Sequence, residues 1–165
     1  MNRMRIYLRG AQRSDLRFLR EMLYEGVFWR ANADRPSFEE GLAFPGVKKE
    51  LADWGERDGD TAVVAIVGST RVGAAWYRFW TEDDSSSGYI NGNTPVLAIA
   101  VHRDYRNRGI GRRMIAWLID RASKQSIAQI SLSVSKDNRA LRLYPELGFQ
   151  EYFDRGDAFT MFRKT

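Results

Sequence analysis

The segment from Val101 to Arg113 combines two glycines with a cluster of arginines, residue types that together bind phosphate. Gly109 and Gly111 have no Cβ, so the backbone there can approach a ligand closely. A helix is expected to begin at these glycines, and its unpaired N–H groups and positive dipole end attract an anion. Four arginines, whose guanidinium groups each offer several hydrogen-bond donors, flank these glycines: Arg106, Arg108, Arg112 and Arg113. The segment therefore indicates binding of a phosphorylated ligand.

Two common phosphate-binding loops do not match this segment. A P-loop needs Gly, four residues and then Gly-Lys before Ser or Thr, and the sequence has no such run. A dinucleotide-binding fingerprint needs three glycines, whereas this segment has two. A third pattern fits Arg106, Gly109 and Gly111: Arg or Gln, two residues, Gly, one residue, then Gly or Ala. A basic turn that only caps a helix is the structural alternative.

Strands and helices are expected on both sides of the glycines. Val96–Val101 is continuously apolar, like a strand buried on both faces, and residues 110–122 carry an apolar stripe at helical spacing. Further strands are expected at 4–9, 61–67, 71–80, 127–134, 149–153 and 158–163. Further helices are expected after Ser14 as N-cap, after a Ser37–Glu40 capping box, over 47–54 and over 138–147. This order predicts an α/β (α+β) fold, with a mixed, mainly antiparallel central sheet flanked by about four helices.

Length and composition narrow the class of protein. The 165 residues are expected to form one domain, 1–165, and 44% hydrophobic residues suffice for its core. The absence of cysteine excludes disulfides and a cysteine nucleophile. The N-terminus has no apolar signal region, and the longest apolar run, 62–67, is too short to cross a bilayer. We therefore expect a cytoplasmic protein without a membrane partner, whose net charge of +5 favours anionic ligands.

A second segment, Asn138 to Phe149, strengthens the interpretation of the first. It reads NRALRLYPELGF and follows the next expected strand. It resembles motif B of the GNAT N-acetyltransferase family, which typically reads Asn, then Ala, then Leu-Tyr, three residues and Gly-Phe. The first segment, Val101 to Arg113, which we call the glycine segment, resembles the cofactor motif of the same family. The resemblance covers most of the chain and is strongest from Val96 to Phe149, and it implies the GNAT acyltransferase fold.

The resemblance also implies a cofactor site for acetyl-CoA. In that family the strand matching Val96–Val101 splays from the strand matching 127–134, and the pantetheine arm bonds the exposed edge, here at Ile99, Ala100 and Val101. The pyrophosphate lies on the loop and helix start, here Arg106, Asn107, Arg108, Gly109, Ile110, Gly111 and Arg112. The motif B Asn, matched to Asn138, contacts the cofactor, and Tyr144 stands near the thioester sulfur as the catalytic acid. The resemblance requires no metal.

Two departures from the family pattern bear on these assignments. One residue fewer separates Asn from Ala here, so counting back from Tyr144 places Asp137 at the Asn position, and Asn138 is then a helix N-cap. Both alternatives stay open. Pro145 follows the tyrosine, and an interior proline removes a helical hydrogen bond and disfavours helical geometry before it. Either the helix kinks or Tyr144 is displaced.

The general base is not evident from the sequence. Transfer to an amine needs a group that takes the amine proton, yet residues 94–101 contain no carboxylate. Glu25, or the run Glu82, Asp83 and Asp84, could serve, although each also suits a solvated surface. His102, the single histidine, follows the strand directly and suits a structural role.

Three functions remain as alternatives. The first is an enzyme that moves the acetyl group of acetyl-CoA directly to a primary amine of a small molecule or a protein. The second is a non-catalytic acyl-CoA-binding regulator on the same fold. The third is a basic nucleic-acid-binding module, which is disfavoured because aromatics do not alternate with the arginines. No nucleic-acid partner is therefore expected, and the sequence leaves open whether two copies form a homodimer.

Overall fold

A computed structural model describes residues 4–30 and 34–165. The strands are β1 (Ile6–Gly10), β2 (Thr61–Val67), β3 (Thr70–Arg78), β4 (Val96–Val101), β5 (Gln129–Ser135), β6 (Gln150–Asp154) and β7 (Ala158–Lys164). The α-helices are α1 (Leu16–Val27), α2 (Phe38–Ala43), α3 (Pro45–Lys48), α4 (Ile110–Lys124) and α5 (Leu143–Glu146), and the 3-10 turns are η1 (Arg13–Asp15), η2 (Lys49–Leu51), η3 (Arg103–Tyr105) and η4 (Arg139–Arg142). Among the described residues, no helix has the length and apolar character needed to cross a bilayer.

The described strands form one seven-stranded sheet in the order β1-β2-β3-β4-β5-β7-β6. Every neighbouring pair is antiparallel except β4 and β5, which run parallel. The β4–β5 register contains the single pair Val96–Ser131, whereas β3 pairs with all six residues of β4. The mixed, mainly antiparallel sheet is confirmed, and it opens between β4 and β5 beyond that pair.

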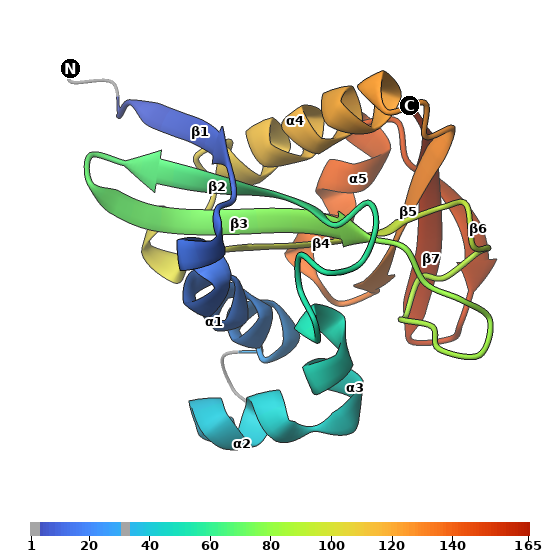
Figure 1. The fold of residues 1–165 in the computed structure, drawn as a ribbon, viewed down its shortest axis with the longest axis horizontal. Helices are drawn as coiled ribbons and strands as arrows, with labels where there is room; N and C mark the ends of the chain where they lie inside the picture. The colour runs from blue at the N-terminus through green and yellow to red at the C-terminus, as the bar shows by residue number, and fades with distance from the viewer. Residues whose placement is uncertain (1–3, 31–33) are drawn as a thin grey trace.

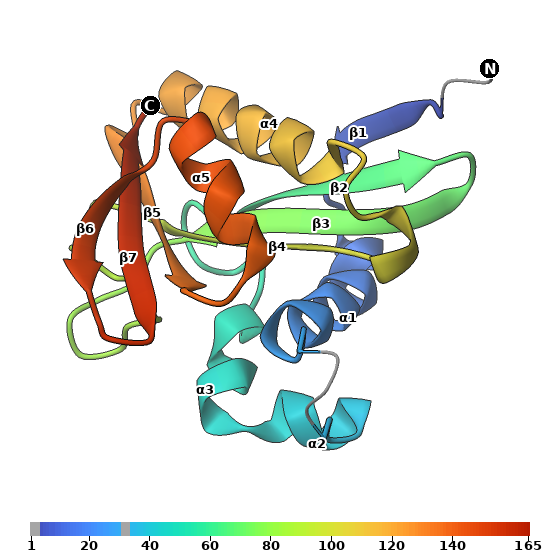
Figure 2. The same ribbon diagram turned by 180° about the vertical axis from the view of Figure 1, so that it is seen from behind.

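Helices cover both faces of the sheet (Figures 1 and 2). Strand β2 shows how one buried strand serves both layers, because successive side chains point to opposite faces. Val63 and Ala65 pack in a core that includes Met114 and Leu118 of α4. Val64 instead packs in a second core, with α1 residues such as Leu19. The α1–α3 layer and the α4–α5 layer thus lie on opposite sides of the sheet.

The predicted helix starts are partly right. The Ser37–Glu40 capping box is present at the start of α2, with the Glu40 N–H donating to Ser37 Oγ at 3.2 Å. Ser14 as the N-cap of the first helix is wrong, because it lies inside turn η1. Asp15 precedes α1, and its buried carboxylate accepts from the Gln12 N–H at 2.7 Å. The Asp15 carboxylate at the start of α1 also forms ion pairs with two arginines outside the helix, Arg9 and Arg71.

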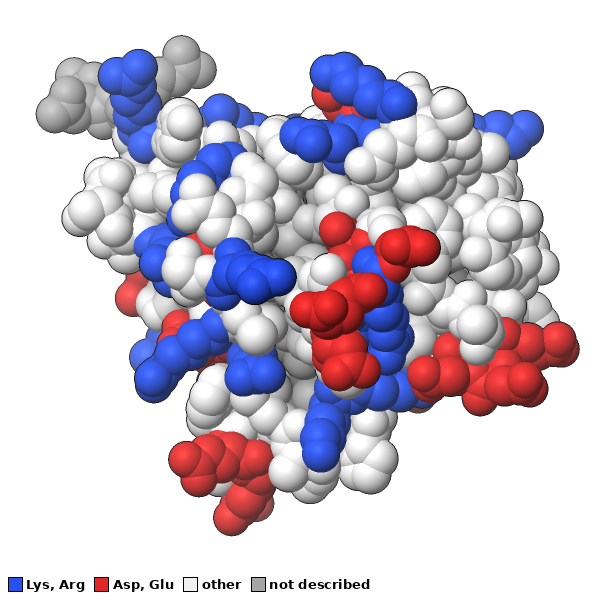
Figure 3. Space-filling model, viewed as in Figure 1, with Lys and Arg blue, Asp and Glu red and all other residues white. Residues whose placement is uncertain are grey.

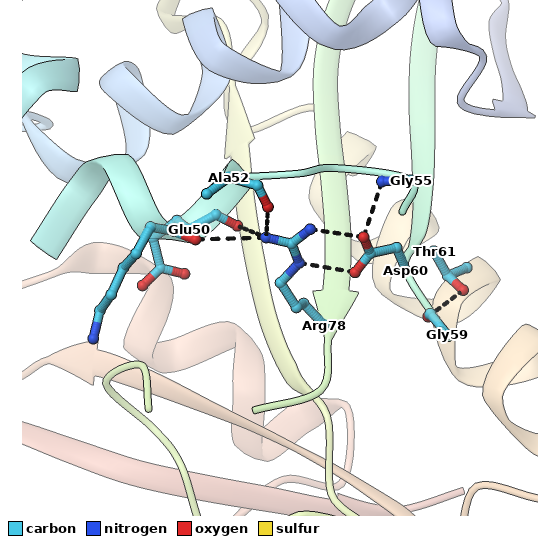
Figure 4. Close-up of polar contacts among 8 residues, drawn as sticks. Glu50, Ala52, Gly55, Gly59, Asp60, Thr61 and Arg78 are labelled. Atoms are coloured by element: carbon cyan, nitrogen blue, oxygen red, sulfur yellow. Dashed lines mark hydrogen bonds and ion pairs between the residues drawn. The ribbon is translucent and has the colours of Figure 1, made fainter. Parts of the chain in front are cut away.

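The helix predicted over 47–54 ends earlier than expected. After α3 and η2 the chain becomes extended at Ala52, where ψ is 134°. The reason lies in β3, where the Arg78 guanidinium approaches the turn's carbonyl groups and donates to the Ala52 carbonyl oxygen at 2.6 Å. Carbonyls that would continue a helix are bound instead by a side chain (Figure 4). This tertiary contact was not visible in local spacing.

Candidate active site

The opening between β4 and β5 exposes one edge of β4. Beyond Val96 this edge has no strand partner in the described structure, although β3 pairs with the opposite edge as far as Val101. Ile99, Ala100 and Val101 lie on this stretch, as the sequence placed them. A strand edge without a partner presents N–H and C=O groups to whatever lies in the gap. The gap can hold an extended, amide-containing chain by strand-like hydrogen bonds.

The loop after β4 delivers backbone amides to the end of this gap. Asn107 and Gly109 both have positive φ, at 60° and 79°. Gly109 is the N-cap of α4, and no side chain caps the helix there. The first N–H groups of the helix therefore remain free to donate hydrogen bonds. A Cβ on Gly109 would meet nothing within 4 Å. We call the loop at 107–109 together with the start of α4 the cradle. It borders open space at the start of a 15-residue helix, an arrangement that suits a diphosphate.

Gly111 lies where three elements converge. A Cβ at this position would lie 3.5 Å from Cδ1 of Ile99 and 3.9 Å from Cδ2 of Leu143. These are ordinary contact distances, so Gly111 differs from Gly109, whose positive φ itself requires glycine-like freedom. The start of α4, the edge of β4 and α5 are brought together at this residue.

The arginines of the glycine segment bind protein groups. Arg106 Nε donates to the Val101 carbonyl oxygen at 2.9 Å and ties the loop to the end of β4. Arg112 forms an ion pair with Glu146 of α5. Arg108 lies over the Tyr105 ring, 5.5 Å from its centroid, and Arg113 donates to the Ile6 carbonyl. These side chains hold the cradle in shape while contributing positive charge to it.

Other cations, which the sequence interpretation missed, line a hollow of about 700 Å³ beside the cradle. We call it the arginine hollow, and it is lined by Asn107, Lys136, Asp137, Asn138, Arg139, Leu141, Arg142, Leu143 and Glu146. Arg139 and Arg142 are three residues apart in the second motif, a spacing that places side chains on one helical face. The three-residue spacing of Arg139 and Arg142 was the signal in the sequence that could have indicated these additional cations.

The structure shows Asn138 as a helix cap. Its Oδ1 accepts the Ala140 N–H at 2.9 Å, so Asn138 is the N-cap of η4. Asp137, the alternative at the motif position, pairs with Arg30 at 3.2 Å. Both residues line the arginine hollow, but each side chain already has a protein partner.

Tyr144 is buried, and it lies together with Pro145 inside the one-turn helix α5. The helix predicted over 138–147 is divided into η4 and the one-turn helix α5, which places Pro145 in a first turn, where a missing N–H costs little. The Tyr144 ring packs edge-on against Phe149, with centroids 5.7 Å apart. Burial raises the pKa of Tyr144 to about 12, so the phenol keeps its proton at neutral pH. Its hydroxyl donates to no described residue, and Tyr144 as a whole is 5% exposed.

The candidate bases named from sequence are exposed or already paired. Glu25 pairs with Arg35 at 3.2 Å, and Asp84 lies 4.0 Å from Lys49. Glu82 and Asp83 are exposed in the loop between β3 and β4. His102 Nδ1 accepts the Asp104 N–H at 3.3 Å and caps η3, which is the structural role expected.

Comparison with known proteins identifies the family. The model of the acetyltransferase (GNAT) family matches residues 27–149. The Escherichia coli ribosomal protein bS18-alanine N-acetyltransferase is 43% identical over 57 residues, 34% of this chain and 38% of that protein, so the match spans well under half of the relative's length.

Solved structures share the fold over nearly the whole chain. PaiA N-acetyltransferase from Thermoplasma acidophilum, in complex with coenzyme A, superposes with a TM-score of 0.70, at 19% identity over 98% of this chain and 100% of that chain. The ribosomal-protein-alanine N-acetyltransferase from Brucella melitensis gives 0.69, at 22% identity over 96% and 99%. The open strand edge, the uncapped start of α4 and the adjacent cations fit the extended arm and phosphates of the family's acyl donor, acetyl-CoA. The chain belongs to the acetyltransferase (GNAT) family.

Proposed function

We propose that this protein transfers the acetyl group of acetyl-CoA directly to a primary amine. The observation that carries the proposal is the unpaired edge of β4, which leads through the loop at 102–109 to the uncapped start of α4. Acetyl-CoA supplies the activated acetyl thioester when bound. Ile99, Ala100 and Val101 would bind the amide-containing arm through backbone groups, and the amides of 107–112 would bind the diphosphate.

The remaining phosphate would be bound by the arginine hollow. Lys136, Arg139 and Arg142 line it, and an arginine presents a fork of donors that matches phosphate oxygens. In this assignment Arg106 and Arg112 position the loop and α5 through their protein partners, the Val101 carbonyl and Glu146. Asn138 likewise positions η4 by capping it.

Proton movements in the transfer require one donor and one acceptor. Tyr144 is the proposed donor, because its phenol is protonated and its hydroxyl has no hydrogen-bond partner among the described residues. A backbone N–H near Ile99 would polarise the acetyl carbonyl. Transfer is direct, since the 165 residues include no cysteine to carry an acyl group.

Two classes of acceptor follow from the comparisons and the sequence. The similarity to the ribosomal protein bS18-alanine N-acetyltransferase of Escherichia coli supports an amine of a protein as the acceptor, and a small-molecule amine is the other class. On the face seen in Figure 3, acidic side chains are interspersed among the basic ones, and several arginines of the glycine segment bind protein groups, which disfavours a nucleic-acid module.

The test is a thiol-release screen with acetyl-CoA and a panel of amines, preceded by a melting-temperature measurement with CoA. We expect CoA to raise the melting temperature, because it binds the folded state only. Thiol release that depends on an amine supports the enzyme. A melting-temperature rise without release from any amine supports the non-catalytic regulator instead, which the lack of a carboxylate at 94–101 favours.

A further inference from the structure

A second hollow, of about 480 Å³, lies on the α1–α3 side of the sheet. We call it the Glu50 hollow. It is bounded by η2, by the loop at 85–89 and by the β6–β7 hairpin, and it does not share a lining residue with the arginine hollow. Nothing in the glycine segment or in the second motif pointed to it.

The Glu50 hollow lies next to the opening between β4 and β5. Its lining residue Gly88 rests on β5, where a Cβ would come within 2.7 Å of the Leu132 carbonyl carbon. The Gly88 carbonyl accepts from Ser131 Oγ at 2.8 Å, and Ser131 is the β5 residue that pairs with Val96. Another lining residue, Thr160, pairs with Ser133, two residues further along β5. The hollow therefore reaches β5 where the two strands begin to diverge.

The half-buried Glu50 carboxylate lines this hollow and accepts one short hydrogen bond, from Ser86 Oγ to Oε1 at 2.6 Å. Burial raises the pKa of Glu50 above its ordinary value, and the Ser86 hydrogen bond and the charges of Lys49 and Arg78 partly offset this rise, while Asp84 adds to it. The other titratable groups that line the hollow are Tyr89, Tyr152 and Arg155.

A buried ion pair fixes the backbone that carries Glu50. The side chains of Arg78 and Asp60 are 1% and 2% exposed, and two hydrogen bonds join them, Nε to Oδ1 at 2.8 Å and Nη2 to Oδ2 at 2.7 Å. The remaining nitrogen of Arg78 binds the turn's backbone carbonyls, including that of Glu50 at 3.4 Å. Figure 4 shows the Glu50 carboxylate pointing away from the Arg78 guanidinium. Arg78 thus positions Glu50 without forming an ion pair with it.

Aromatic side chains form the opposite wall. Tyr152 and Phe153 are consecutive residues of β6, and consecutive strand residues normally face opposite sides. The register with β7 shifts between Glu151 and Phe153, and both aromatic residues line the hollow. Tyr152 is 56% exposed and Phe153 is 62% exposed, so apolar surface is available to a ligand.

We propose that the Glu50 hollow binds the acceptor amine and that Glu50 accepts its proton. The inference rests on the proposed function. A Glu50 carboxylate oxygen takes one proton from the ammonium, which frees the nitrogen lone pair to form a bond to the acetyl carbon, and a second nitrogen proton then leaves to water. The carbon–sulfur bond breaks, its electron pair leaves on sulfur, and sulfur takes a proton from Tyr144 or water. Glu50 later releases its proton to water.

The charges of the hollow select among amines. Two cationic side chains, Lys49 and Arg155, line it together with the single carboxylate of Glu50. A polyamine would bring several positive charges to a site that can neutralise one. A peptide N-terminus brings one ammonium, carbonyl oxygens for the cations and side chains for the aromatic wall. The acceptor class inferred is therefore the α-amine of a peptide or protein.

The experiment compares Glu50→Gln with wild type, using an alanine-initiated tetrapeptide and spermidine as probes. Glutamine keeps the shape and can still accept from Ser86, so the fold is preserved. We expect kcat/KM for the peptide to fall by about 10²-fold or more near neutral pH. The deficit shrinks as pH rises, because more of the amine is already neutral. CoA affinity, measured by titration calorimetry, stays unchanged, and Glu56→Gln, at an exposed glutamate outside the hollow, keeps full activity.

The outcomes separate this inference from the function on which it rests. If wild type transfers acetyl to the peptide and Glu50→Gln does so equally well at every pH, Glu50 is not the proton acceptor. If spermidine has the higher kcat/KM in wild type, the peptide class is wrong. If wild type binds CoA but releases thiol with no amine, the proposed function and this inference both fall.

Discussion

Arg30 and Asp137 are 107 residues apart in sequence, yet two hydrogen bonds of 3.3 and 3.2 Å join them. Arg30 follows α1, and Asp137 follows β5, so the pair connects the α1 layer to the rim of the arginine hollow. Both side chains are about half exposed or more, at 49% and 62%. An exposed pair contributes little to stability, so its main effect is on local charge.

This pair predicts opposite effects of two substitutions on CoA affinity. Arg30→Ala leaves the Asp137 carboxylate unpaired among the cations of the arginine hollow, so phosphate binding should weaken about two- to fivefold at low salt. Asp137→Asn removes that charge and should strengthen binding to a similar degree. Titration calorimetry checks both, and the double variant should behave like Asp137→Asn. Weaker binding in all three variants would mean that Asp137 contacts the ligand itself.

The cradle predicts that Gly109 can be tested apart from its backbone strain. Gly109→Asn places a residue that tolerates positive φ into open space, so it should keep a near-native melting temperature but lose at least tenfold in CoA affinity. Gly109→Val should lose affinity and also destabilise the fold. The matched control is Gly68→Asn, in the β2–β3 turn, where φ is also positive and a Cβ also meets nothing within 4 Å. Wild-type CoA affinity in a folded Gly109→Asn protein would refute the cradle.

Tyr144→Phe is expected to lower kcat about 10²-fold while CoA affinity stays the same. The phenol's pKa of about 12 means that its ionisation contributes no pH limb in the wild-type rate below pH 10. Steady-state kinetics and calorimetry on the same preparation separate the two effects. An unchanged kcat would show that water protonates the leaving sulfur.

Asp15→Asn should destabilise the fold by about 2–3 kcal/mol, because Arg9 and Arg71 lose a fully buried carboxylate partner. The hydrogen bonds from Arg9 hold the pKa of Asp15 below its ordinary value. A lowered carboxyl pKa stabilises the fold above the unfolded pKa of about 4, and this contribution is lost as pH falls through the folded pKa. Urea unfolding should show the lower unfolding free energy of Asp15→Asn at pH 7 and a smaller difference from wild type at acidic pH. The exposed Asp58→Asn serves as the control.

Glu50→Gln should behave in the opposite way and stabilise the fold at neutral pH. Burial raises the pKa of Glu50, so the folded state favours the protonated form. Stability falls as pH rises from the unfolded pKa of about 4.3 through the higher folded pKa, and a glutamine does not titrate. In urea unfolding, the variant's gain in free energy of unfolding should be present at pH 7 and vanish at acidic pH. Such a gain is typical when a residue serves activity rather than stability. A destabilised variant at pH 7 would instead indicate that the carboxylate is structurally required.

Much of this protein could be predicted from its sequence because the signals are local. The continuous apolar run of β4 and the striped α4 came from spacing alone, and both lie where expected. Gly109 at a helix start follows from residue types over a few positions. The helical pattern over 138–147 correctly placed Tyr144 in a helix, although that pattern could not show that η4 and α5 divide the segment.

Other features depend on which strands become neighbours. Arg78 ends the η2 turn, and Arg30 binds Asp137, through contacts between segments 26 to 107 residues apart, and no local pattern encodes a partner at that distance. Glu50 looked like one surface carboxylate among many. It becomes distinctive only when the loop at 85–89 and β6 fold over it, because burial and a hydrogen bond, not residue type, change what a carboxylate can do. The sequence indicated the proposed cofactor side of the site, where backbone and glycine spacing would carry the chemistry, and only the tertiary structure brings together the residues of the proposed acceptor side.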